Sequence, residues 1–220
     1  VEMQIGKGFF EPMIGRVNVL DWRTGEKRKT NINDAGDLVK LADALDNYHI
    51  LHSGSIMPSI EGIPAGTSHV HGYLQGIKNS SKVIKGSCRG RKVAEDCVEM
   101  ASIWSGIPKE KLCQKPNIFT TCNIISPLKL DQAQTQGLMV FAKYGLPVDI
   151  TSEPQLGSTS PVSLAGTLVQ PTAEVLSGIV VAQSVIPGTP VWFGACGGDM
   201  DMKAGSIALG GVEGALINIA

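Results

Sequence analysis

The stretch RKVAEDCVEMASIWSGIPKEKLCQKPNIFTTCNIIS, residues 91–126, contains the pattern that decides the fold. Its first part, residues 91–106, spaces apolar residues as an amphipathic helix does and ends at a glycine. Its last part, residues 117–126, begins with a short apolar run that is typical of a strand buried on both faces. The stretch therefore predicts a helix followed by a buried strand.

The same helix-strand unit recurs along the chain, about five times in all. Because helices that alternate with buried strands favour a parallel sheet, the pattern predicts an α/β fold. A doubly wound sheet also fits the count. We favour a partial (β/α)8 TIM barrel, because no glycine-rich phosphate loop follows any strand and polar residues follow almost every strand. The helix and strand patterns cover residues 31–45 and 48–55, 68–79 and 82–88, 91–106 and 117–126, 131–145 and 147–154, and then a long helix after Pro161 with 190–196.

We assign residues 1–30 to an accessory β-hairpin segment and residues 31–220 to the partial barrel, truncated at its C-terminus. Alternating residues in GRVNVLDWRTGEKRKT, 15–30, predict the hairpin, with its turn at Thr24 and Gly25. The chain begins without Met and ends inside a helical pattern, so we interpret it as an internal fragment. An isolated part of a barrel exposes sheet edges, and we expect it to be poorly stable and inactive alone.

Two local predictions concern the helices. In the first helix, Asn33 is the expected N-cap, and the apolar spacing predicts one buried face. That predicted face consists of Leu38, Leu41, Ala42 and Leu45. Ser163 and Thr172 are expected caps around the long helix.

Composition and charge exclude several classes of protein. The chain has 220 residues, is 43% hydrophobic and carries a net charge of -1, so it has enough apolar residues for a core. Its lysines and arginines are scattered, which argues against nucleic acid as a partner. Its five cysteines form no CxxC pair and indicate reduced thiols in a cytoplasmic protein. No run approaches the roughly 18 apolar residues of a membrane span, so we expect no membrane segment.

Polar residues gather where the predicted strands end. In a barrel the active site forms from these positions, and here they are rich in hydroxyls and amides, with several carboxylates and few cations. This chemistry suits a small polar or cationic ligand better than a phosphate. The positions are His52, Ser53, Ser55, Ser87, Arg89, Thr121, Asn123, Ser126, Thr151, Ser152, Glu153, Gln155, Ser158–Ser160, Gly194, Gly197, Gly198, Asp199 and Asp201.

Simpler interpretations of these residues remain open. Serines and threonines after strands are commonly helix caps, and Asp199 and Asp201 also fit solvated loop carboxylates. His69 and His71 lie two residues apart in a helical pattern and face different sides, so we predict no metal site. The residues alone indicate a barrel enzyme for a small molecule, with no catalytic residue identified.

Residues 157–194, GSTSPVSLAGTLVQPTAEVLSGIVVAQSVIPGTPVWFG, closely resemble the trimethylamine methyltransferase family. Weaker resemblance extends over most of the chain, to VLDWRTGEKRKT, DLVKLADALDN, HVHGYLQGIKNSSKVI and CNIISPLKLD. The resemblance implies a TIM-barrel methyltransferase that moves a methyl group from a methylated amine to the Co(I) of a cognate corrinoid protein, in one-carbon metabolism or methanogenesis. The corrinoid (cobalamin) is then carried by the partner, since this chain lacks the DxHxxG pattern of corrinoid-carrying modules.

The substrate implied by the resemblance is a quaternary amine such as glycine betaine, with trimethylamine as the other choice. The loop GACGGDMDMKAG, residues 194–205, differs from the Ser/Thr-rich loop of trimethylamine enzymes and favours a member without pyrrolysine. A cation of this kind needs carboxylates and aromatic walls. The predicted substrate-binding residues are Glu153, Gln155, Ser158, Thr159, Ser160, Asn123, Trp192 and Asp199.

Two other functions stay open at this point. A non-catalytic amine-binding barrel would need the same pocket but no surface for a corrinoid protein. Another TIM-barrel lyase or transferase for a small polar substrate would use a metal or a strand-end lysine, and only Lys85 and Lys203 are candidates. A homo-oligomer is compatible with all three.

Overall fold

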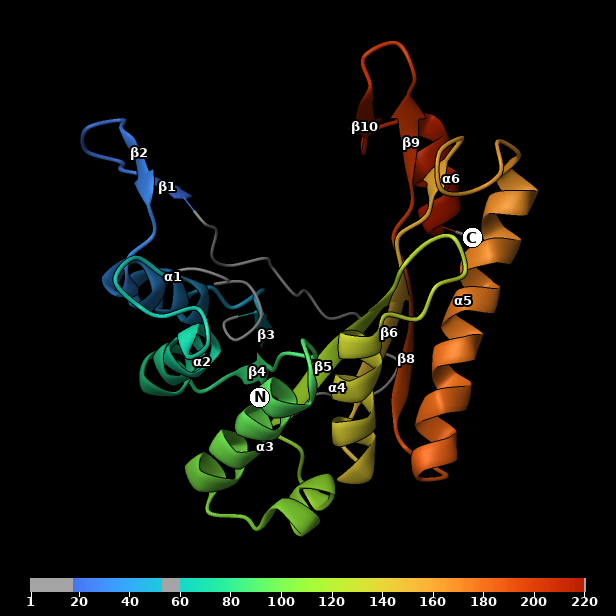
Figure 1. The fold of residues 1–220 in the computed structure, drawn as a ribbon. Coiled ribbons are helices and arrows are strands. Elements are labelled where there is room, and N and C mark those ends of the chain that lie inside the picture. Colours follow the sequence, from blue (N-terminus) through green and yellow to red (C-terminus); the bar gives the residue numbers. More distant parts are fainter. Residues whose placement is uncertain (1–17, 53–59, 220) are drawn as a thin grey trace. The chain divides into compact units, whose positions relative to one another are not determined.

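The computed structural model describes residues 18–52 and 60–219 and shows a mixed α/β fold with parallel strands (Figure 1). The chain divides into two compact units, residues 1–87 with 92–120, and residues 88–91 with 121–220. Strand β5 (Ile118–Ile124) is divided between the units: residues 118–120 belong to the first unit and residues 121–124 to the second.

The first unit opens with the predicted hairpin. Strands β1 (Asn18–Leu20) and β2 (Lys27–Lys29) pair antiparallel, with Val19 opposite Arg28. In the turn, the Asp21 carboxylate accepts the backbone N–H of Arg23 at 2.9 Å. The hairpin is confirmed for this part, and residues 1–17 of the predicted accessory segment lie outside the described residues.

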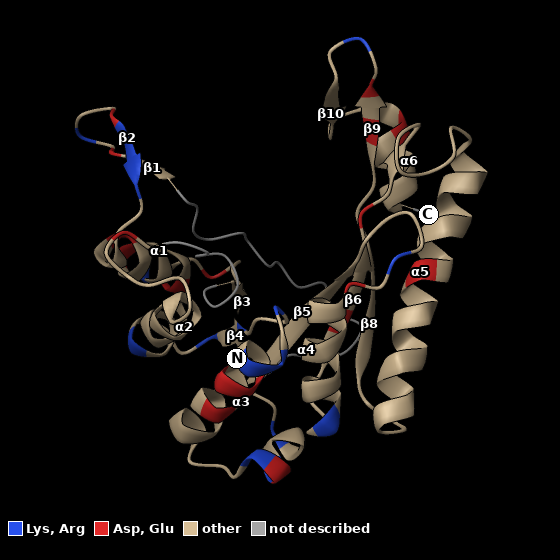
Figure 2. Ribbon diagram, viewed as in Figure 1, with Lys and Arg blue, Asp and Glu red and all other residues tan. Residues whose placement is uncertain are grey.

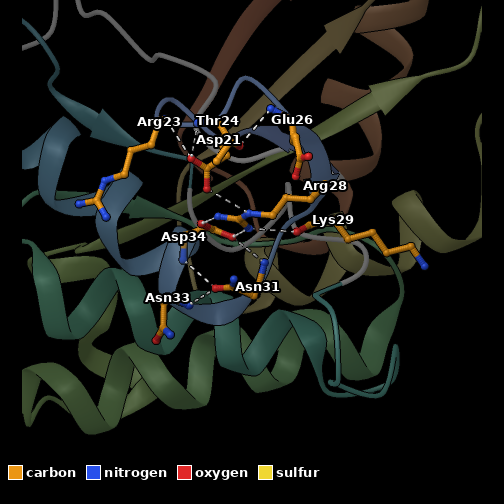
Figure 3. Close-up of polar contacts among 9 residues, drawn as sticks. All are labelled: Asp21, Arg23, Thr24, Glu26, Arg28, Lys29, Asn31, Asn33 and Asp34. Carbon is orange, nitrogen blue, oxygen red and sulfur yellow. Dashed lines mark hydrogen bonds and ion pairs between the residues drawn. The ribbon is translucent and has the colours of Figure 1, made fainter.

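Helix α1 (Ile32–Ala44) is capped at its N-terminus by Asn31, whose side chain accepts hydrogen bonds from the backbone N–H groups of Asn33 and Asp34. The Asp34 carboxylate accepts the Asn31 N–H at 2.9 Å in return, and Arg28 donates to both Asp34 oxygens at 2.6 and 2.8 Å (Figure 3). The predicted cap at Asn33 is therefore wrong by two residues, because Asn33 donates to the cap instead of forming it.

The buried face of α1 is made of small side chains. It consists of Ala35, Gly36, Val39 and Ala42, whereas Leu41 is 59% exposed and Leu45 41% exposed. The predicted face was therefore wrong for these two leucines. Helix α2 (Ser68–Asn79) packs closely against α1: a Cβ on Gly36 would lie 2.8 Å from Gln75 Oε1.

The parallel strands of the first unit follow the order β3-β4-β5. Their apolar side chains lie in register, with Leu51 beside Ile84 and Ile84 beside Ile118, and all three are buried. This confirms the parallel pairing predicted from the helix-strand units. The elements are β3 (Ile50–Leu51), β4 (Val83–Lys85), α3 (Arg91–Ser105) and the 3-10 helix η1 (Lys109–Gln114).

In the second unit, β6 (Val148–Ser152) pairs in parallel with β8 (Val191–Ala195) along its whole length. Helices α4 (Gln132–Lys143) and α5 (Leu164–Val185) lie side by side next to these strands (Figure 1). Gly178 allows α5 to approach closely, because a Cβ there would lie 2.6 Å from Ile150 Cγ2. Gly178, which interrupts the apolar sequence of α5, therefore allows this helix to pack closely on β6.

A second, three-stranded sheet of order β10-β9-β7 was not predicted. Residues 155–156 and 198–201 were expected in loops after strands, and no element was predicted for residues 206–208; the strands there are only two to four residues long. The elements are β7 (Gln155–Leu156), β9 (Gly198–Asp201), β10 (Ser206–Ala208) and α6 (Val212–Ile219).

Helix α5 is the long helix predicted after Pro161. Ser163 is its N-cap, as predicted, and accepts the Gly166 N–H at 3.2 Å, but Thr172 lies inside the helix and donates to the Leu168 carbonyl. The predicted cap at Thr172 is therefore wrong. With 22 residues and a mean hydropathy of 1.4 over 18 of them, α5 meets the length and composition of a membrane span, contrary to the sequence-based expectation. In this unit it packs on β6 and β8.

Candidate functional site

The two faces of the second unit's strands differ in chemistry. Ile150 of β6 lies against α5 at Gly178, and Ile124 of β5 approaches the same glycine. Because successive side chains of a strand alternate, the residues next to these isoleucines point to the opposite face of the sheet. We call this opposite side the polar face, and it consists of Thr121, Asn123, Asp149, Thr151, Trp192 and Gly194.

Asp149 is the charged group of the polar face. Its Oδ2 accepts the Thr121 hydroxyl at 2.9 Å, and its Oδ1 accepts the Thr151 hydroxyl at 2.8 Å. A Cβ on Gly194 would lie 2.3 Å from Thr151 Oγ1, so the glycine leaves room for this cluster. Trp192 is the residue of β8 directly opposite Asp149, so a carboxylate and an indole lie on one face of adjacent strands. This pair of groups has the chemistry to hold an organic cation.

A second cluster lies on the helix side, around Glu174 of α5. Glu174 is 1% exposed and accepts the Ser126 hydroxyl and the Leu128 N–H, each at 2.7 Å. It also accepts the Ser152 hydroxyl, and the Gln170 amide at 3.0 Å. One buried carboxylate thus connects α5 to the turn after β5 and to the end of β6.

Four of the predicted substrate-binding residues lie together in one tight turn. The Gln155 carbonyl accepts the backbone N–H groups of Ser158, Thr159 and Ser160. The Thr159 hydroxyl accepts the Gln155 N–H at 2.9 Å, and the Ser160 hydroxyl lies 3.0 Å from the hydroxyl of Thr167 in α5. These hydroxyls are therefore occupied in fixing the turn and its contact with α5.

The other predicted residues lie in three places. Glu153 is exposed directly after β6. Asn123 and Trp192 lie on the polar face with Asp149. Asp199 belongs to β9, opposite Leu156 of β7. Its Oδ1 is buried without a hydrogen-bond partner among the described residues.

In the first unit, the strand-end candidate His52 lies beside Lys85. The Lys85 Nζ is 2.7 Å from His52 Nε2 and 5.9 Å from the centre of the Phe119 ring. Lys85 is 7% exposed. Ser53 and Ser55, also named from the sequence, lie outside the described residues. Within residues 18–52 and 60–219, no three His, Cys, Asp or Glu side chains come together as metal ligands.

Sequence reasoning missed Asp149 and Glu174. Both carry a signal: Asp149 is a lone charge inside the strand pattern PVDITS, and Glu174 is the only charged residue of α5, which is almost without charge in Figure 2. Carboxylates of the site were expected only after strands, so a charge within a strand and one within a helix were not predicted.

Comparison with known proteins identifies relatives over most of the chain. The family model for trimethylamine methyltransferase (MTTB) matches residues 1–220. A glycine betaine methyltransferase of Desulfitobacterium hafniense strain Y51 is 43% identical over 192 residues, covering 87% of this chain and 40% of the relative. A trimethylamine methyltransferase MttB of Methanosarcina barkeri is 34% identical over 187 residues, covering 85% of this chain and 37% of the relative. The chain thus spans about two fifths of the length of these relatives, and it belongs to the trimethylamine methyltransferase family.

Proposed function

We propose that the full-length protein is a cytoplasmic methyltransferase that moves a methyl group from a quaternary amine such as glycine betaine to the Co(I) of a separate corrinoid protein. Family membership supports the reaction, and the 43% identity to a protein named glycine betaine methyltransferase supports the substrate. Five free cysteines support a cytoplasmic location. We further propose that residues 31–220 form part of a (β/α)8 barrel with the polar face inside.

The observation that carries the proposal is the Asp149 carboxylate, held by two hydroxyls and placed opposite Trp192. A quaternary ammonium has no N–H to donate, so it is recognised by negative charge and by the face of an aromatic ring. The Thr121 and Thr151 hydroxyls hold the carboxylate in one orientation. In this proposal Asn123 and Trp192 belong to the site, while Glu153, Asp199 and the turn at Gln155–Ser160 lie outside it.

The reaction requires little acid-base catalysis from the residues of this chain. The C–N bond breaks with its electron pair remaining on nitrogen, and the amine leaves neutral, so no proton has to be supplied. The corrinoid on the partner supplies the nucleophile that accepts the methyl group. The work of the residues described here is to bind the cation, exclude water and orient one methyl group, which are effects of positioning and desolvation.

The test uses the full-length protein with a Co(I) corrinoid protein and glycine betaine. We expect loss of the Co(I) absorption with release of dimethylglycine. Asp149→Asn should raise KM about 10-fold, the order of magnitude for losing one carboxylate near a partly desolvated cation. Glu153→Gln, which removes an exposed carboxylate four residues away, is the matched control and should leave KM unchanged.

Two results would contradict the proposal. Saturable binding of glycine betaine without any change at cobalt would favour an amine-binding protein. A raised KM in Glu153→Gln with a normal Asp149→Asn would move the cation site from the polar face to the residues after β6.

A further inference from the structure

Among residues 18–52 and 60–219, no Lys, Arg or His side chain forms an ion pair with the buried carboxylate of Glu174. It is 1% exposed, and its described hydrogen-bond partners are two serine hydroxyls, one amide side chain and one backbone N–H. A carboxylate removed from water is stable only when such donors satisfy its oxygens. The four donors come from the turn after β5, from the end of β6 and from α5 itself. The arrangement therefore fixes these three segments relative to one another within the second unit.

The turn after β5 depends on this carboxylate. Leu128 has a φ of 53°, in the left-handed region that a leucine rarely adopts. Its N–H donates to Glu174 Oε1, and Ser126, two residues earlier, donates to Oε2. The hydrogen bonds hold a backbone conformation that leucine does not prefer. Leu128 is 70% exposed and lines a groove of about 510 Å³ along α5.

The end of β6 is linked to the same carboxylate. Ser152 donates to Glu174 on the helix side, and its neighbour Thr151 points to the polar face and donates to Asp149. Because adjacent residues of a strand point to opposite faces, fixing Ser152 also fixes the direction of Thr151. The Glu174 carboxylate thus acts on the Asp149 cluster through the backbone of β6.

We propose that Glu174 is a positioning residue for the cation site: it holds the ends of β5 and β6 so that Thr151 keeps the Asp149 carboxylate oriented. This inference rests on the proposed function for its ligand. Glu174 itself lies on the helix side of β6 and touches no substrate. Its effect on binding is therefore a matter of geometry, and its negative charge is dispensable.

The experiment measures the Kd for glycine betaine by calorimetry in the full-length protein, on variants shown to be folded by circular dichroism. Glu174→Ala should weaken binding about 10-fold, because the Asp149 orientation is lost. Glu174→Gln should stay within about 3-fold of the original Kd, since its Oε1 still accepts the Leu128 N–H and its Nε2 bonds the serine hydroxyls, which reorient as acceptors. Ser152→Ala, a milder change if Glu174→Ala does not fold, should weaken binding about 3-fold.

Gln183 supplies the matched control. It lies in the same helix, and its side chain accepts the Gly188 N–H and donates to the Thr189 carbonyl, each at 2.8 Å, in the turn before β8. Gln183→Ala should lower the melting temperature yet leave Kd unchanged. An unchanged Kd in Glu174→Ala or in Ser152→Ala would overturn the inference. Equal weakening in Glu174→Ala and Glu174→Gln would overturn it too, because charge would then be the cause.

A second readout separates this inference from the proposed function. Amide hydrogen exchange in a peptide covering residues 145–152 should be faster in Glu174→Ala and normal in Glu174→Gln. If the original protein binds no quaternary amine, the proposed substrate is wrong, and the exchange result still decides whether Glu174 holds the end of β6. Unaltered exchange in Glu174→Ala refutes the positioning role in either case.

Discussion

Arg28 lies between the carboxylates of Asp21 and Asp34, 3.6 Å and 2.6 Å away, and joins the hairpin to the start of α1. The Arg28 hydrogen bonds lower the pKa of Asp34, against the opposing effect of its partial burial. The backbone N–H groups of Arg23 and Thr24 lower the pKa of Asp21. One residue, Arg28, thus connects the hairpin and α1, which the sequence patterns predict as separate elements.

The lowered pKa of Asp34 predicts a pH-dependent contribution to stability. A carboxyl with a depressed folded-state pKa stabilises the protein above the unfolded value, here 3.8, and this contribution is lost as pH falls through the folded-state pKa. We expect Asp34→Asn to lower the free energy of unfolding at pH 7 and to have a smaller effect at pH about 3, below the unfolded value. Urea unfolding at both pH values measures this. A mutational effect that stays constant with pH would argue against the ion pair.

At the scale of elements, periodicity predicted helix positions well. The pattern 68–79 coincides with α2, and 91–106 differs from α3 by one residue. Details that depend on neighbours were less predictable. Leu41 has the right spacing for a buried face but is exposed, because α2 packs on the small residues of α1. The side of a helix that is buried depends on which element packs against it, and a single sequence does not contain this information.

Glu174 and Asp149 were not predicted as parts of the candidate site for the same reason, because their hydrogen-bond partners are distant in the sequence. The sequence shows that Glu174 is the only charge in an apolar helix, but three of its four donors lie 22 to 48 residues earlier in the chain, at Ser152, Leu128 and Ser126. Asp149 likewise needs Thr121, 28 residues away. Spacing along the chain carries no information about such encounters.

The close contact of α5 with β6 predicts a cost for enlarging Gly178. Alanine favours helix by about 1 kcal/mol over glycine, but its Cβ would lie 2.6 Å from Ile150 Cγ2. We expect Gly178→Ala to destabilise the protein by about 1–3 kcal/mol, as overpacking does. Ser184→Ala, on the exposed side of the same helix, should be neutral. Thermal unfolding of both variants gives the comparison, and a stabilised Gly178→Ala would show that the packing is looser than described.

At the scale of the whole chain, both units bury apolar cores, yet α5 leaves large apolar side chains in contact with solvent. Val169 is 69% exposed, Leu176 51% and Val180 64%. They lie seven and four residues apart along the helix, about two turns and one turn, and form one stripe. Exposed apolar stripes of this kind promote association.

We therefore expect the 220-residue chain to self-associate. The double variant Val169→Lys with Val180→Lys should shift it toward the monomer in analytical ultracentrifugation, because two charges interrupt the stripe. Helix content by circular dichroism should not change, since both side chains are exposed. If the double variant associates as strongly as the parent chain, the surface that drives association lies outside this stripe. A monomeric, cooperatively melting parent chain would also contradict our expectation that it is poorly stable alone.

The Glu174 contacts also have a consequence for the order of folding. The turn at Ser126–Leu128 is synthesised well before Glu174, 46 to 48 residues earlier, and its donors have no carboxylate to bind until α5 docks. Contacts between residues so distant in the chain form late, because closing the loop costs entropy that nothing yet offsets. The polar face opposite α5 therefore acquires its final form only when the helix has docked. A nascent chain stopped before residue 174 would lack the carboxylate that fixes the geometry at the ends of β5 and β6.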